Sequence, residues 1–100
     1  MFMSKSYFVY ILSNKSNTTL YTGVTNNICH RIYEHRNGKR GSFTKKYNVN
    51  KLVYIELVEN KEKSLKRELQ IKKWNREWKL ELIIEKNPNF DDLYQEHCKS

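Results

Sequence analysis

The stretch that decides the fold is Tyr7-Phe8-Val9-Tyr10-Ile11-Leu12, six consecutive residues that are aromatic, β-branched or otherwise apolar. A run without polar alternation predicts a strand that is covered on both faces, and therefore a strand in the centre of its sheet. Polar, turn-prone residues follow at 13–18, and Leu20-Tyr21-Thr22-Gly23-Val24 returns as a second strand. We expect the two strands to form a hairpin.

A helix is expected directly after this hairpin. Thr25-Asn26-Asn27 offers side-chain oxygens that cap a helix N-terminus, and Asn37-Gly38 is a typical stop signal. The helix between them should run to about Arg36. Ile28 and Ile32 are spaced i, i+4, so we expect both to face the core.

The second half of the chain predicts one more strand and further helices. The expected elements are a strand at 52–58, a helix at 61–73, a helix at about 75–86 and a last amphipathic turn or two at 91–97. Asn60 should cap the first of these helices, with Leu65 and Leu69 facing inward. The order ββαβαα predicts an α/β protein of the α+β type, in which a small three-stranded antiparallel sheet is flanked by helices. Residues 1–86 should form this domain, with 87–100 as a C-terminal extension packed on it.

Composition indicates a folded, basic protein. The chain is 38% apolar and 30% charged, and its longest apolar run is far shorter than the roughly 20 residues that span a bilayer. We therefore expect a cytoplasmic protein without membrane association. The net charge is +8 and is concentrated: seven basic residues stand against one acidic residue at 31–51, and eight against three at 61–79. Such clusters predict a polyanionic partner.

The two cysteines, Cys29 and Cys98, are far apart and belong to no CxxC pattern. We expect free thiols in a reducing cytosol. A zinc site formed by these two residues with His30 and His35 is an alternative, although it lacks the paired spacing of such sites.

Two tyrosines are expected to meet on one face of the hairpin. Tyr10 lies in the middle of the first strand and Tyr21 on its partner. Gly23 follows Tyr21 by two residues, points to the same face and leaves that face without bulk. A glycine within a strand often marks the close approach of a ligand or of another backbone. The alternative is that both tyrosines are core aromatics whose hydroxyls reach the surface.

Three further polar residues border the apolar stripes of the expected helices. Arg31 and His35 are one turn apart beside the isoleucines of the first helix. Glu68 lies on the apolar side of a basic helix, where a carboxylate is costly unless it has a partner. That partner could be Arg31, a metal ion or both, and a purely structural salt bridge to Arg31 remains open.

In this order, these residues resemble the catalytic set of the GIY-YIG endonucleases. Val9-Tyr10 and Tyr21-Thr22-Gly23 look like the two motifs that name the family, and Arg31, His35 and Glu68 follow at matching spacing. The resemblance covers about 6–84 and is closest to small single-domain bacterial members, which are similar to the N-terminal nuclease domain of the bacterial excinuclease.

Three motif positions depart from the family pattern. Phe8 and Val9 stand where the first motif has glycine and isoleucine, and Thr22 replaces the isoleucine of the second. These positions are structural, and the tyrosines of both motifs are intact.

The resemblance implies a metal-dependent endonuclease that hydrolyses DNA, including branched or damaged forms. It implies that Glu68 holds one Mg²⁺ or Mn²⁺ and that Arg31 grips the scissile phosphate. Tyr21 is the candidate general base, with Tyr10 orienting the water. An unperturbed tyrosine has a pKa of about 10, so this role requires nearby positive charge. His35 would bond a phosphate oxygen or pass the proton on.

The partners implied are DNA, in preference to RNA, and a protein that supplies specificity, because no second module for reading base edges follows. Residues 38–42 do not form a Walker loop and are better interpreted as a clamp on the nucleic-acid backbone. The expected nucleic-acid contacts are Lys39, Arg40, Lys45, Lys46 and Lys73.

Two alternative functions remain open at this point. The domain could bind DNA or RNA without turnover, or its basic face could dock an acidic protein. Trp74 and Trp78 are spaced i, i+4, which favours core packing over base stacking.

Overall fold

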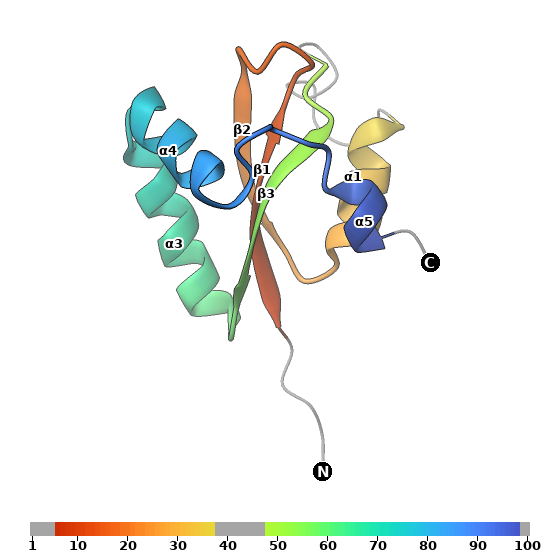
Figure 1. The fold of residues 1–100 in the computed structure, drawn as a ribbon. Helices are drawn as coiled ribbons and strands as arrows, with labels where there is room; N and C mark the ends of the chain where they lie inside the picture. Colours follow the sequence, from red (N-terminus) through yellow and green to blue (C-terminus); the bar gives the residue numbers. More distant parts are fainter. Residues whose placement is uncertain (1–5, 38–47, 99–100) are drawn as a thin grey trace.

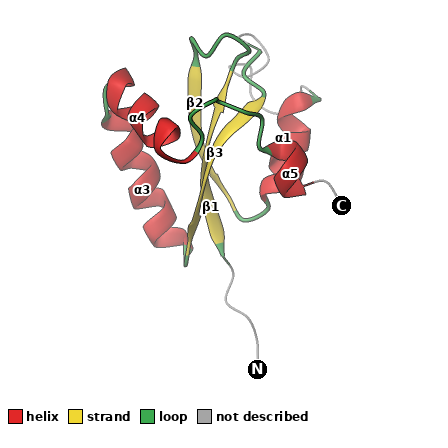
Figure 2. Ribbon diagram, in the orientation of Figure 1, coloured by secondary structure: helices red, strands yellow, loops and turns green. Residues whose placement is uncertain are grey.

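The protein was studied as a computed structural model, which describes residues 6–37 and 48–98 of the 100-residue chain. Its elements in chain order are β1 (Tyr7–Ser13), β2 (Leu20–Thr25), α1 (Ile28–Arg36), β3 (Lys51–Val58), α3 (Lys61–Lys73), α4 (Arg76–Lys86) and α5 (Tyr94–Cys98). Helices and strands are coloured separately in Figure 2. The predicted α+β fold with a three-stranded antiparallel sheet is confirmed. Within the described ranges, no helix has both the length and the apolar composition needed to cross a membrane.

β1 is the central strand, as its apolar run predicts. The strand order is β2-β1-β3, and both neighbours run antiparallel to β1. Helices cover both faces of the sheet, α1 and α5 on one side and α3 and α4 on the other (Figure 1). Side chains that alternate along β1 therefore enter two different cores, which explains why every residue from Val9 to Ser13 is buried.

Each face of the sheet has its own apolar cluster. Val9 and Ile11 pack with Ile71 of α3 and Ile83 of α4. On the opposite face, the cluster joins β1 to α1 and consists of Tyr10, Leu12, Ile28, Ile32, Val49 and Leu52. The prediction that Ile28 and Ile32 face the core is confirmed.

An asparagine caps each of the three longer helices. The side chains of Asn27, Asn60 and Asn75 accept hydrogen bonds from backbone N–H groups three residues ahead, at 3.2, 2.9 and 2.9 Å. Each bond satisfies a donor that the first turn of a helix leaves without an intrahelical partner. Because this signal is local, the predicted bounds of these three helices agree with the observed ones within one or two residues.

Three side chains expected in the core are exposed instead. Leu65 is 42% exposed, Leu69 56% and Trp78 55%, so these predictions were wrong. The residues that α3 buries completely are Ser64 and Ile71, which lie two turns apart on another stripe. The stripe that faces the sheet is therefore the one with Ser64 and Ile71, and the two leucines lie outside it.

The end of the described chain packs on α1 and β3. The Leu93 N–H donates to the Leu52 carbonyl at 2.7 Å, and Arg36 forms an ion pair with Asp92. α5 lies against α1 (Figure 1). The two helices in this contact also carry the two cysteines of the chain.

Cys29 and Cys98 form a disulfide, so the expectation of free thiols was wrong. Docking of α5 on α1 brings their Cα atoms to 5.6 Å, a separation that suits the bond. Sequence spacing could not show this, because 69 residues separate the two cysteines. The zinc alternative loses both of its sulfur ligands, and the described residues contain no cluster of three or more metal-ligating side chains.

Candidate active site

A pocket of about 410 Å³ lies at the edge of the sheet, beside β2. Four of the predicted site residues line it: Tyr21 and Gly23 from β2, Arg31 from α1 and Glu68 from α3. β2 is an edge strand, and α1 and α3 cover opposite faces of the sheet. The pocket therefore gathers residues from both layers of helices around one strand edge. Figure 1 shows these two layers on either side of the sheet.

Tyr10 and His35 form a buried pair behind Tyr21. A hydrogen bond of 3.1 Å joins the Tyr10 hydroxyl to Nε2 of His35, and both residues are at most 6% exposed. The Tyr21 ring lies 5.5 Å from the His35 ring and 6.4 Å from the Tyr10 ring, measured between centroids. Neither Tyr10 nor His35 is among the described residues that line the pocket. The two side chains thus support the position of the Tyr21 ring from the core side.

Gly23 makes room for Tyr10. The two residues pair directly across β1 and β2. A Cβ atom at position 23 would lie 2.5 Å from the Tyr10 hydroxyl oxygen and 2.6 Å from Cζ, far inside van der Waals contact. The phenol of Tyr10 therefore occupies the space that a side chain at position 23 would need.

Arg31 is held at the mouth of the pocket by its own neighbours. Its Nη1 donates to the Val24 carbonyl at 3.3 Å, and its Nε lies 3.8 Å from a carboxylate oxygen of Glu34. The side chain is 24% exposed. A guanidinium in this position is fixed by two contacts and keeps further N–H donors for an anion, since it has five in all.

Glu68 points into the same pocket from α3. Its side chain is 17% exposed, and one carboxylate oxygen lies 3.0 Å from Nζ of Lys72, one helical turn further on. The structural salt bridge considered between Glu68 and Arg31 is not present between these two described residues; each has a different ion partner. Glu68 is thus an acid in a pocket that also carries cations.

Among the lining residues that the reasoning from sequence missed, two carry groups that could act on a substrate, a phenol and an ammonium. Tyr7 and Lys61 border the pocket beside Tyr21 and Glu68. The signal for the lysine was present: Lys61, Leu65 and Glu68 are spaced i, i+4, i+7, so they lie on one stripe of α3, and all three line the pocket. Tyr7 gave no such signal, because it lies at the start of a uniformly apolar run.

The other predicted contact residues fall outside this pocket. Lys39, Arg40, Lys45 and Lys46 lie outside the described residues. Lys73 is exposed at the last position of α3 and does not line the pocket.

Comparison with known proteins agrees with this arrangement. The sequence model of one family, described as the GIY-YIG catalytic domain, matches residues 6–93. The chain belongs to the GIY-YIG family. Since the GIY-YIG catalytic domain is a nuclease domain, membership supports an endonuclease-type activity on nucleic acid.

Relatives of similar size match almost the whole GIY-YIG chain. A UPF0213 protein of Syntrophus aciditrophicus is 52% identical over 86% of this chain and 97% of its own length. A UPF0213 protein of Clostridium perfringens is 46% identical over 80% of this chain and 85% of its own. The solution structure of a UPF0213 protein from Bacillus halodurans is similar, with a TM-score of 0.56 and 28% identity over 90% of this chain and 95% of the other. The chain is thus similar throughout to small single-domain members of the GIY-YIG family.

Proposed function

We propose that the protein is a metal-dependent endonuclease that hydrolyses phosphodiester bonds of DNA, including branched or damaged forms, at the β2 pocket. The observation that carries the proposal is the meeting of Tyr21, Arg31 and Glu68, from three different elements, in one pocket of a GIY-YIG domain. A phenol, a guanidinium and a carboxylate are the groups that this reaction needs. The strong positive charge of the chain supports a polyanionic substrate.

The residues of the pocket fit one hydrated divalent ion. Glu68 supplies a hard carboxylate oxygen, and no other acidic side chain is among the described residues of the pocket. Mg²⁺ often binds through one or two carboxylates and keeps several waters, and Mn²⁺ accepts the same ligands. Such an ion, held by Glu68, would polarise a phosphate oxygen and offset developing charge.

The other residues in and behind the pocket have separate roles in this reaction. Arg31, oriented by the Val24 carbonyl, binds two oxygens of the scissile phosphate. Tyr21 takes the proton from the attacking water, and Arg31 and Lys61 lower the electrostatic cost of an anion beside it. Tyr10 and His35 hold the Tyr21 ring in place, so their part in the reaction is indirect.

The test is a cleavage assay with Mg²⁺ or Mn²⁺ on single-stranded, duplex and branched DNA. Glu68→Gln and Tyr21→Phe should each reduce cutting by about 10²–10⁴-fold while keeping most DNA binding. Glu62→Gln is the matched control: Glu62 pairs with a lysine four residues on in the same helix, as Glu68 does, but lies outside the pocket. This variant should cut like the wild type.

Two results would contradict the proposal. Equal cleavage by all four proteins would point to a contaminating nuclease. Salt-sensitive DNA binding by a wild type that cuts none of the substrates would instead indicate a binding module without turnover.

A further inference from the structure

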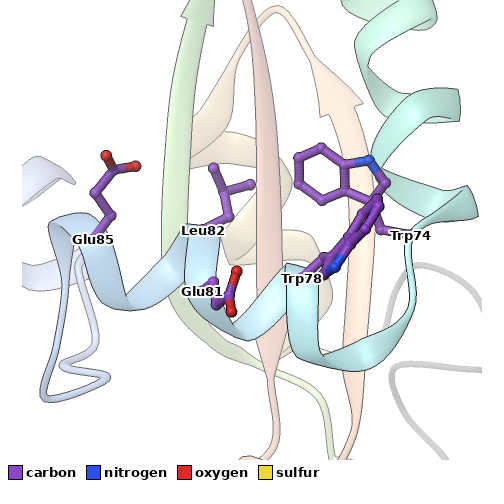
Figure 3. Close-up of a pocket in the computed structure, with 5 residues that line it drawn as sticks. All are labelled: Trp74, Trp78, Glu81, Leu82 and Glu85. Carbon is purple, nitrogen blue, oxygen red and sulfur yellow. The ribbon is translucent and has the colours of Figure 1, made fainter.

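A second pocket lies on α4, away from the candidate active site. It has a volume of about 500 Å³ and is lined by Trp74, Trp78, Glu81, Leu82 and Glu85. None of these residues lines the β2 pocket. Figure 3 shows the two indoles together at the start of α4, with Leu82 and the two glutamates further along the same helix. The catalytic proposal gives this surface no task.

The pocket is acidic in a strongly basic protein. Glu81 and Glu85 are exposed and one turn apart, and neither pairs with a cation in the part of the chain that the structure describes. Two like charges at this spacing are mildly destabilising. Two of the three cations of α4 are turned elsewhere: Arg76 donates to the Thr18 carbonyl, and Lys86 lies over the Tyr54 ring. The third, Lys79, forms no ion pair with either glutamate among the described residues. The negative charge of the pocket is therefore open to an external cation.

The aromatic part of the pocket also favours a cation. The indoles of Trp74 and Trp78 meet edge to face, with centroids 6.0 Å apart. Arg67, held by Glu56, already lies 5.3 Å from the centroid of Trp74. Trp78 remains largely exposed, so its indole is available to a second guanidinium or ammonium group.

We infer that this pocket binds a basic segment of a partner protein, with an arginine or lysine side chain on Trp78 and paired with Glu81 and Glu85. Nucleic acid is disfavoured as the occupant, because both carboxylates would repel its phosphates. Leu82 adds an apolar floor for the stem of a long basic side chain. The inference rests on this pocket alone and does not depend on the nuclease proposal.

The probe is a blocked, fluorescein-labelled peptide of about ten residues that alternates arginine with glycine. Both tryptophans of the chain line this pocket, so intrinsic tryptophan fluorescence reports on it selectively. We expect the peptide to change that fluorescence and to bind in an anisotropy titration at low salt. The net charge of +8 repels this peptide, so binding requires the local acidic site.

Charge-matched variants separate the pocket from the general surface. Glu81→Gln with Glu85→Gln should weaken binding by about tenfold or more. Glu62→Gln with Glu96→Gln removes the same charge from exposed positions elsewhere and should leave the affinity unchanged. Trp78→Ala should abolish binding, and circular dichroism should show an intact fold because the side chain is exposed.

Three outcomes would overturn the inference. The first is equal affinity of the wild type and the Glu81/Glu85 double variant for the peptide. The second is tryptophan quenching by a single-stranded oligonucleotide that Trp78→Ala abolishes, which would assign the pocket to base stacking. The third is self-association of the wild type that Trp78→Ala abolishes, which would make a second copy of this chain the occupant.

Discussion

Gly23 and Tyr10 illustrate how single residues shape the candidate site. Alanine is normally tolerated at least as well as glycine within a strand, because it loses less backbone freedom on folding. Here the added methyl group would overlap the buried phenol of Tyr10. We therefore expect Gly23→Ala to lower the free energy of unfolding by about 1–3 kcal/mol, measured by urea denaturation.

A double-mutant cycle identifies the cause of that loss. In a Tyr10→Leu background the methyl group has room, so Gly23→Ala should cost markedly less there. The same cost in both backgrounds would mean that the glycine is required for backbone reasons and not by the phenol.

Tyr54 predicts a pH dependence at the alkaline end. Burial, followed by the hydrogen bond that its hydroxyl donates to Glu56 at 2.6 Å, raises the pKa of Tyr54 well above its usual value. The folded state thus keeps this proton where the unfolded chain releases it. The stability is fully present below about pH 10, the ordinary tyrosine pKa, and is lost as pH rises beyond it, by up to about 1.4 kcal/mol per pH unit.

This predicted loss of stability can be measured by urea denaturation from pH 8 up to the highest pH at which the protein is still folded. The wild type should lose stability more steeply above about pH 10 than Tyr54→Phe, which lacks the titrating group. Parallel pH curves for the two proteins would show that Tyr54 contributes nothing to the alkaline loss.

At the residue scale, the sequence predicts which residues belong to the site, but not which of them line the pocket and which lie behind it. Tyr21, Arg31 and Glu68 could be named because a motif and helical spacing mark them. That Tyr10 and His35 lie behind Tyr21 depends on how α1 packs on the sheet, which spacing does not encode.

Among the elements, α4 offers a clear test of capping. Asn75 is in extended conformation, and its side chain accepts from the Trp78 N–H, directly before the helix that carries the acidic pocket. Asn75→Ala should lower the free energy of unfolding by about 1 kcal/mol, as measured by chemical denaturation. Asn75→Asp preserves the accepting oxygen and should restore most of this stability; equal losses in both variants would argue against a capping role.

Element ends and element faces differ in how far sequence determines them. Asn27, Asn60 and Asn75 act on N–H groups three residues away, so a local pattern suffices to place the helix starts. The buried face of α3 is set by its contacts with β1 and β2. Ser64 is fully buried while the more apolar Leu65 is 42% exposed, so burial along this helix follows position relative to the sheet and not the apolarity of the side chain.

For the whole molecule, the apolar run of β1 predicts that helices cover both faces of this strand. No sequence pattern predicts how the C-terminal end of the described chain docks. Asp92 contacts Arg36 and also accepts from the Leu52 N–H, which ties three distant segments together. These contacts join residues up to 56 positions apart. No periodicity links such positions, so neither they nor the disulfide beside them could be predicted.

The Cys29–Cys98 disulfide gives the final prediction. It closes a loop across a sequence separation of 69 residues, and loop-closure entropy then predicts a stabilisation of about 4 kcal/mol over the reduced chain. Reduction with dithiothreitol should lower the free energy of unfolding by up to this amount, measured by urea denaturation. The loss should stay below the total stability, because the hydrogen bond from Leu93 and the Arg36–Asp92 pair still hold the chain end.

A Cys29→Ser, Cys98→Ser double variant is the control for this experiment. It should match the reduced wild type and should not respond to dithiothreitol. Thiol titration of the folded, air-oxidised wild type should find no reactive thiol, since the chain has only these two cysteines. Two titratable thiols, together with unchanged stability after reduction, would contradict the bond and restore the expectation of free cysteines. The chain end would then be held by the Arg36–Asp92 pair, the backbone contact of Leu93 and the packing of Leu93 and Tyr94 on the core beside α1, and Asp92→Ala should weaken the docking of α5 on α1.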